Sequence, residues 1–140
     1  EKQMGKDDFT ACPNGAPGVE ERLMLLYSEG VAKGRITMHR LVETLCTTPC
    51  RTYGLYPEKG ALQPRADADP VILDPVTSSV LTHSRMHGAV DYTSYEGMEI
   101  QGEIRLVMQR GNVLVKENQF IGEKSAGRFI RRKPCAEIAD

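Results

Sequence analysis

The stretch that decides the fold runs from Thr47 to Pro75 and reads TTPCRTYGLYPEKGALQPRADADPVILDP. Before this stretch, apolar residues recur every three or four positions, which is typical of helices that bury one face. After it, apolar residues alternate with polar ones or form short β-branched runs, which is typical of strands. The chain therefore changes from helices to strands within this stretch, and the pattern predicts an α+β fold.

Three helices are predicted before the change. Gly34 is placed to end the first, Thr37 to cap the start of the second, and Pro49 to open a short third helix that stops at Gly54. Their buried faces are predicted from two stripes: Val19, Leu23, Leu26, Tyr27 and Val31, then Met38, Leu41, Val42 and Leu45. Such helices suit the last turns of a barrel's outer ring, and they suit a small helical domain equally well.

Short strands are predicted after the change. Val71–Leu73 reads as one buried strand and Val80–Thr82 as another. Alternating residues predict a hairpin from 104 to 116 that turns at Arg110-Gly111, and Phe120-Ile121 is placed to extend the sheet. Pro70 cannot donate a ladder hydrogen bond, so the first strand should begin late or lie at an edge.

Composition limits the class of protein. The chain has 140 residues, enough for one domain with a core, and its net charge of -1 argues against a dedicated binder of nucleic acid or of anionic membranes. No apolar run approaches the roughly 20 residues that span a bilayer. Because the first residue is Glu1, we expect a processed or truncated piece of a longer protein; a trimmed N-terminus is the alternative.

The cysteines predict no disulfide framework. Cys12, Cys46, Cys50 and Cys135 are irregularly spaced, which favours reduced thiols in a cytoplasmic protein. Pro49 is expected to interrupt any helical face shared by Cys46 and Cys50, and no further zinc ligands lie near them in sequence.

Two other pairs of residues are candidates for a functional site. His83 and His87 are four positions apart, a metal-binding spacing on a helix, but the surrounding residues argue against a helix and favour structural histidines or a surface loop. Asp67 and Asp69 are interpreted as solvated aspartates at a turn before a strand. The sequence contains neither a phosphate-binding loop nor a nucleophile elbow.

Several short motifs, in their order and spacing along the chain, resemble those of the dihydropyrimidinase and hydantoinase family of cyclic amidohydrolases. The resemblance covers nearly the whole chain. The motifs that carry it are Gly5-Lys6-Asp7-Asp8-Phe9, Pro13-Asn14-Gly15, Pro17-Gly18-Val19-Glu20, Gly54-Leu55-Tyr56-Pro57, Ala66-Asp67-Ala68-Asp69, Val90-Asp91-Tyr92, Glu96-Gly97 and Gly127-Arg128-Phe129-Ile130. Arg65, Pro70, Cys12 and Cys50 depart from the family pattern at positions that concern strand geometry and packing.

The resemblance implies a fold and an activity. The family's enzymes have a (β/α)8 barrel with two zinc ions, which activate a hydroxide that opens a cyclic amide. The metal ligands would lie upstream, so no catalytic or metal-binding residue is assigned here, and the fragment alone is expected to be inactive and to bind no zinc. Asn14 matches the asparagine whose backbone hydrogen-bonds the ring amide of the substrate; independently, it reads as a turn residue before Gly15.

The same resemblance divides the chain. Residues 1–56 would be the last loop and helices of the barrel, residues 57–121 part of a small β-sandwich, and residues 122–140 a tail that contacts another subunit of a homo-oligomer, a dimer or tetramer. The basic cluster Arg128, Arg131, Arg132 and Lys133 lies in this tail. The substrate would be a small cyclic diamide, such as a dihydropyrimidine or a hydantoin. A non-catalytic dihydropyrimidinase-like protein and an independent α+β binding domain are the alternatives.

Overall fold

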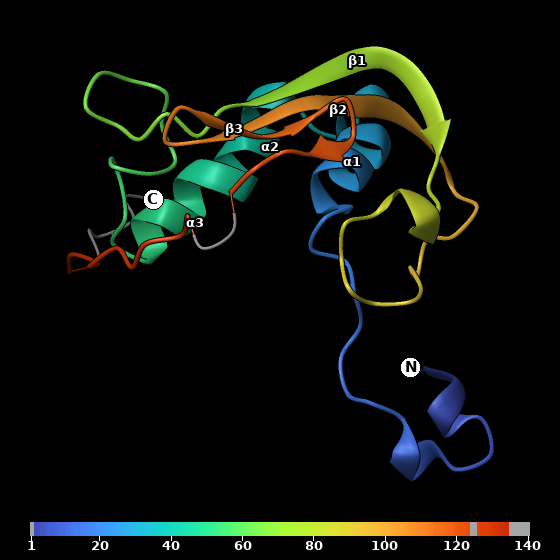
Figure 1. The fold of residues 1–140 in the computed structure, drawn as a ribbon. Coiled ribbons are helices and arrows are strands. Elements are labelled where there is room, and N and C mark those ends of the chain that lie inside the picture. The colour runs from blue at the N-terminus through green and yellow to red at the C-terminus, as the bar shows by residue number, and fades with distance from the viewer. Residues whose placement is uncertain (1, 124–125, 135–140) are drawn as a thin grey trace.

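An antiparallel sheet lies across two helical rods in this computed structural model, which describes residues 2–123 and 126–134. Figure 1 shows the curved sheet on one side of the helices, with the N-terminal residues reaching away from both. These N-terminal residues carry two short 3-10 turns, Lys2–Gly5 and Phe9–Ala11. None of the helices in the described ranges has the length and apolar character needed to cross a membrane.

Each rod joins α-helical and π-helical segments. The first rod consists of α1 (Arg22–Leu26) and η3 (Tyr27–Ala32), and the second of α2 (Met38–Val42), η4 (Glu43–Thr47) and α3 (Thr48–Thr52). The predicted caps are confirmed: the Thr37 side chain accepts a hydrogen bond from the Arg40 N–H at 3.1 Å. Gly34 and Gly54 follow the rods with φ of +70° and +68°, a conformation that favours glycine.

The predicted short third helix is confirmed as α3, with Pro49 in its first turn, but it is not separated from the second helix. Thr47, placed as the residue before α3, has helical φ and ψ of -69° and -50°, so the second rod runs without interruption into Pro49. Proline lacks the N–H that would continue the α-helical ladder, and the π-helical η4 stands immediately before it. The local change in hydrogen bonding lets the rod pass through the proline.

The sheet has the order β1-β2-β3-β4 and is antiparallel throughout. Its strands are β1 (Val71–Val80), β2 (Glu99–Gln109), β3 (Asn112–Lys116) and β4 (Gln119–Phe120). The hairpin turn at Arg110-Gly111 is confirmed, with φ of 48° and 81°. β1 begins directly after Pro70 and lies at the sheet edge, as expected of a residue that cannot donate to a ladder.

The two short strands predicted around Val71 and Val80 are one strand. A register shift between Asp74 and Ser78 bends β1 against β2 and keeps it continuous across the polar residues that separate the two apolar runs. Such a bulge leaves the extra residues of the bulged strand, here residues 75–77 of β1, without register partners on β2. The Gln101 N–H on β2 donates to the Ser28 hydroxyl on the first rod, at 3.1 Å.

Tyr27 joins the first rod to β1 and β2. Its ring is buried, and an ideal Cβ built on Gly102 of β2 would lie 2.5 Å from the ring. Its hydroxyl donates to the Pro75 carbonyl in β1 at 3.4 Å. Leu41 of the second rod is also buried, whereas Val19 precedes the helix and is 81% exposed, so its place in the predicted stripe was wrong.

The described part of the tail runs back along its own chain. The Lys133 N–H donates to the Gly54 carbonyl at 2.8 Å, and Arg128 pairs with Glu58 at 3.4 Å. Phe129 nevertheless remains 89% exposed. Residues 124–125 and 135–140, with Cys135, lie outside the described residues, and so does that part of the predicted subunit contact.

Candidate functional site

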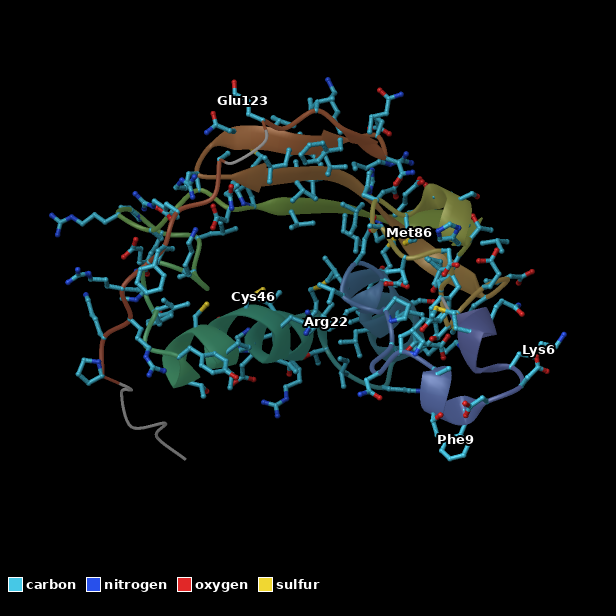
Figure 2. All side chains as sticks on the ribbon, turned by 60° about the horizontal axis from the view of Figure 1, so that its bottom comes forward. Lys6, Phe9, Arg22, Cys46, Met86 and Glu123 are labelled. Atoms are coloured by element: carbon cyan, nitrogen blue, oxygen red, sulfur yellow. The ribbon has the colours of Figure 1, made fainter. Side chains whose placement is uncertain are left out.

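Asn14 lies on an N-terminal arm, which we define as residues 2–18. Asn14 is exposed and is followed by Gly15 at φ +80°, which matches the turn predicted for this position. Figure 2 shows the side chains of Lys6 and Phe9 on this arm, pointing away from the sheet. Within the arm, the Asp8 carboxylate accepts from the Thr10 N–H at 2.9 Å and from its hydroxyl at 2.6 Å. These two bonds hold the pKa of Asp8 below its ordinary value.

The root of the arm is bound by the loop between β1 and β2. Glu20 accepts two hydrogen bonds from His87, from the backbone N–H at 2.9 Å and from ring Nδ1 at 2.7 Å. The neighbouring Glu21 is buried and accepts from the Thr93 hydroxyl at 2.6 Å. Two adjacent carboxylates at the start of the first rod thus hold the same loop at two points.

This loop, residues 82–97, is an Ω-loop, since its ends meet. The Leu81 N–H donates to the Met98 carbonyl and the Gly97 N–H to the Leu81 carbonyl, both at 2.9 Å. Inside the loop, His83 contacts the Val90 carbonyl through Nε2 at 2.6 Å, and its N–H donates to Glu96 at 2.7 Å. The loop is therefore ordered by its own polar groups.

The interpretation of His83 and His87 as structural histidines of a loop is confirmed. His83 begins the 3-10 turn η5 (His83–Arg85), and His87 follows that turn, so the pair does not share a helical face. Each ring instead contacts a different group, Val90 or Glu20. Within residues 2–123 and 126–134, no three His, Cys, Asp or Glu residues are grouped so that they could hold a metal ion.

The interpretation of Asp67 and Asp69 as solvated aspartates is wrong. Both carboxylates bind the Lys59 ammonium, Asp67 at 2.8 Å, and the Lys59 side chain is only 16% exposed. Asp69 also accepts from the Arg110 N–H at 2.6 Å, which ties this turn to the β2–β3 hairpin. Burial alone would lower the pKa of Lys59, but its hydrogen bonds to the two aspartates raise it above the ordinary value.

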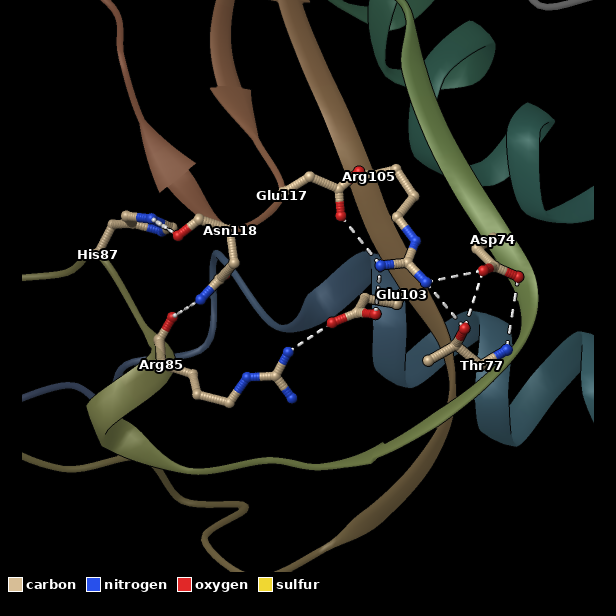
Figure 3. Close-up of polar contacts among 8 residues, drawn as sticks. All are labelled: Asp74, Thr77, Arg85, His87, Glu103, Arg105, Glu117 and Asn118. Carbon is tan, nitrogen blue, oxygen red and sulfur yellow. Dashed lines mark hydrogen bonds and ion pairs between the residues drawn. The ribbon is translucent and has the colours of Figure 1, made fainter.

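A second ionic network lies on the sheet around Arg105 of β2 (Figure 3). Its guanidinium binds Asp74 of β1 and Glu117 of the β3–β4 turn, each at 3.0 Å, and Glu103 at the same distance. Asp74 also accepts from the Val76 N–H at 2.9 Å and from the Thr77 hydroxyl at 2.8 Å. The Val76 N–H, followed by Arg105 and Thr77, holds the pKa of Asp74 far below its ordinary value.

Acid should therefore weaken the fold through Asp74. Because the pKa of Asp74 is lowered on folding, its contribution is fully present above the unfolded value of 3.8 and is lost as the pH falls below it. We expect Asp74→Asn to be less stable than the wild type at neutral pH, with a difference that shrinks between about pH 5 and pH 2. Denaturant midpoints measured across this range check the prediction, and a difference independent of pH would contradict it.

Cys46 and Cys50 share a helical face, so the prediction that Pro49 separates them is wrong. Both line a groove of about 560 Å³ between the second rod and β1, and Figure 2 shows Cys46 on the side of the helix that faces the sheet. Gly60 closes over this point, since a Cβ there would lie 2.7 Å from the Cys50 Cβ. Burial raises the pKa of both thiols, which favours their neutral, unreactive form.

Sequence reasoning missed two residues of these sites, Lys59 and Glu20. Lys59 lies within the stretch from Thr47 to Pro75, and the two aspartates that follow it, Asp67 and Asp69, could have indicated an ion pair. No local pattern links Glu20 to His87, 67 residues away. A pairing over such a separation depends on how the Ω-loop packs, which periodicity does not report.

The chain is similar, in sequence and in structure, to hydantoinases and a dihydropyrimidinase. No family model matches the chain. It is 45% identical over 132 residues to D-hydantoinase of Ralstonia pickettii and 46% identical over 132 residues to D-phenylhydantoinase of Escherichia coli, in each case over 94% of this chain and 29% of the relative. The structure of dihydropyrimidinase from Brevibacillus agri superposes with a TM-score of 0.91 at 38% identity, over 96% of this chain and 29% of that one.

The relatives agree in sequence and in fold. The chain spans less than a third of their length, so what they do as whole proteins concerns more residues than these. Identities well above 30% across 94% of the chain, with a superposition that covers nearly all of it, support the resemblance noted in the sequence. The chain belongs to the dihydropyrimidinase and hydantoinase family and corresponds to a C-terminal portion of such a protein.

Proposed function

We propose that this chain is the C-terminal part of an enzyme that hydrolyses cyclic amides, opening dihydropyrimidines or hydantoins to N-carbamoyl amino acids. The observation that carries the proposal is the 45% identity over 132 residues with a D-hydantoinase. The proposed substrate is a small cyclic diamide. The proposed location is the cytoplasm, which is supported by the free thiols of Cys12, Cys46 and Cys50. A non-catalytic relative with the same fold is the competing function.

In the proposed enzyme, the two rods belong to the outer ring of the barrel, and residues 57–121 belong to a β-sandwich. Features of the sheet support this division. β1 is an edge strand, and Ile72 and Val76 on it are 53% and 79% exposed. An apolar edge of this kind needs a covering layer. The groove of about 560 Å³ beneath it is also lined mainly by apolar residues.

The two zinc ions implied by the family would be held outside this chain. The described residues offer no group of three ligands for a metal ion, so we assign no step of the metal chemistry to them. When bound, the zinc ions would activate the water that attacks the ring carbonyl. The task left to this chain is to bind and orient the ring.

Asn14 is the proposed contact with the ring. A cyclic imide presents N–H and C=O groups in a fixed plane, and the backbone of an exposed turn presents the complementary pair. Asn14 lies in such a turn before Gly15. Since the proposed contact is the main chain, the asparagine side chain is expected to matter less than the shape of the turn.

The two positions predict different effects in the full-length protein. Asn14→Ala should lower kcat/KM for dihydrouracil by no more than about threefold, because the backbone contact survives. Gly15→Val should lower it by at least about tenfold, because φ of +80° strains a β-branched residue. Steady-state kinetics checks both. A complete loss in Asn14→Ala at unchanged stability would show that the side chain itself acts.

The tail is proposed to contact a neighbouring subunit in a dimer or tetramer. Its backbone is held by Gly54 and its Arg128 by Glu58, so it presents Phe129 on a supported segment. The exposed aromatic ring next to a basic cluster is a combination common at protein interfaces. We expect the tail to act in assembly and not in catalysis, because none of its residues belongs to the arm that carries Asn14.

A further inference from the structure

We propose that Glu20 and His87 form a clasp that positions the arm for substrate binding; this inference rests on the proposed function of Asn14. The Glu20 carboxylate accepts from His87 at two points, ring Nδ1 at 2.7 Å and the backbone N–H at 2.9 Å. Two bonds to the two oxygens of one carboxylate fix its orientation as well as its position. The clasp joins the root of the arm to the Ω-loop.

The Ω-loop side of the clasp is itself held by the sheet. His87 Nε2 contacts the Asn118 carbonyl at 3.2 Å, and the Asn118 amide donates to the Arg85 carbonyl at 3.2 Å. Arg85 binds Glu103 of β2 at 2.6 Å, and Figure 3 shows these contacts side by side. Both ring nitrogens of His87 therefore face oxygen atoms, the Glu20 carboxylate and the Asn118 carbonyl.

The clasp lies directly after the arm, between Gly18 and the start of the first rod. Gly18, with φ of +153°, lies two residues before Glu20, and Gly15 lies five before it. Both have positive φ, a conformation that glycine adopts readily. Anchoring Glu20 holds the C-terminal end of this segment against the Ω-loop and so restricts the positions open to Asn14, six residues before it.

Glu20 and His87 are thus positioning residues and do not touch the substrate. Losing either should leave the chemical step intact and weaken the binding of the ring. The expected kinetic result is a rise in KM with little change in kcat. The expected structural result is faster backbone hydrogen exchange in the arm, because a local opening becomes easier.

The test uses the full-length protein with Glu20→Ala, His87→Ala and the double variant. In each single variant, backbone hydrogen exchange of the peptide covering residues 13–19 should rise about fivefold, the scale of a lost hydrogen bond. The double variant should add little to either, since both remove the same contact. Glu29→Ala is the matched control: Glu29 binds Lys33 at 2.6 Å and is 29% exposed, and its loss should leave arm exchange unchanged.

His87→Asn separates the clasp from general damage. Its amide can donate near the place of ring Nδ1, and the backbone N–H remains, so arm protection and KM should recover relative to His87→Ala. Additive effects in the double variant, or arm exchange unchanged in both single variants, would overturn the clasp. Faster arm exchange with unchanged KM in an active enzyme would overturn its role in positioning.

Exchange and kinetics also separate this inference from the function on which it rests. If the wild type opens no cyclic amide, the proposed function fails, while the exchange measurements still decide whether Glu20 and His87 hold the arm. If the wild type is active and the rate of hydrogen exchange in the arm is unchanged in the Glu20 and His87 variants, the proposed function stands and the clasp is wrong.

Discussion

Gly102→Ala is expected to destabilise the protein by about 3 kcal/mol, through overpacking and backbone strain together. The added Cβ would lie 2.5 Å from Cδ1 of Tyr27, and φ at this position is +98°. The buried ring would have to leave its place between the first rod and the sheet. Its hydrogen bond to the Pro75 carbonyl would be lost with it.

Gly97→Ala is the control for this substitution. Gly97 has φ of +80° and open space around its Cβ position, so it carries the backbone cost of about 1 kcal/mol without the clash. Denaturant unfolding compares the two. Gly102→Ala combined with Tyr27→Ala should cost less than the sum of the single changes. Equal costs at positions 97 and 102 would mean that the ring is not tightly packed on β2.

Gly54→Ala is expected to release the tail from the second rod. An ideal Cβ at Gly54 would overlap the Lys133 carbonyl oxygen, and backbone atoms cannot give way as a flexible side chain can. We expect a loss of stability of about 2 kcal/mol and tryptic cleavage at Arg131 and Arg132 that is about tenfold faster.

Gly34→Ala controls for backbone conformation in this case. Gly34 has nearly the same φ, +70°, and nothing within contact distance of its Cβ position. Its cleavage rate in the tail should match the wild type. If the tail also holds the oligomer, light scattering should show a lower mass for Gly54→Ala alone. Unchanged cleavage in Gly54→Ala would place the tail elsewhere in solution.

Local signals in the sequence predicted the parts of the fold that depend on neighbouring residues. The Thr37 cap, the glycines that end the rods and the hairpin at Arg110-Gly111 are set by backbone conformations that few residue types adopt. Pro70 predicted the edge position of β1 because proline cannot donate to a ladder. These rules act within a few residues and need no tertiary contact.

The errors came from tertiary packing. Pro49 predicted a break, but the second rod continues without interruption through η4 into α3. The polar residues between Val71 and Val80 predicted two strands, but pairing with β2 and a bulge made one. For the site, the exposed turn at Asn14 was predictable from Pro13 and Gly15. The contacts of Glu20, Lys59 and His87 join distant segments, which a linear pattern does not show.

The most direct test of the central claim is ring opening by the full-length protein. Purified protein loaded with zinc would be incubated with dihydrouracil and with hydantoin, and the products identified by mass spectrometry. The account predicts N-carbamoyl amino acids, each the substrate plus one water, formed at a rate that scales with enzyme concentration and is lost after metal removal. A folded, zinc-loaded protein that leaves both rings intact, while a related D-hydantoinase opens them in the same buffer, would contradict it.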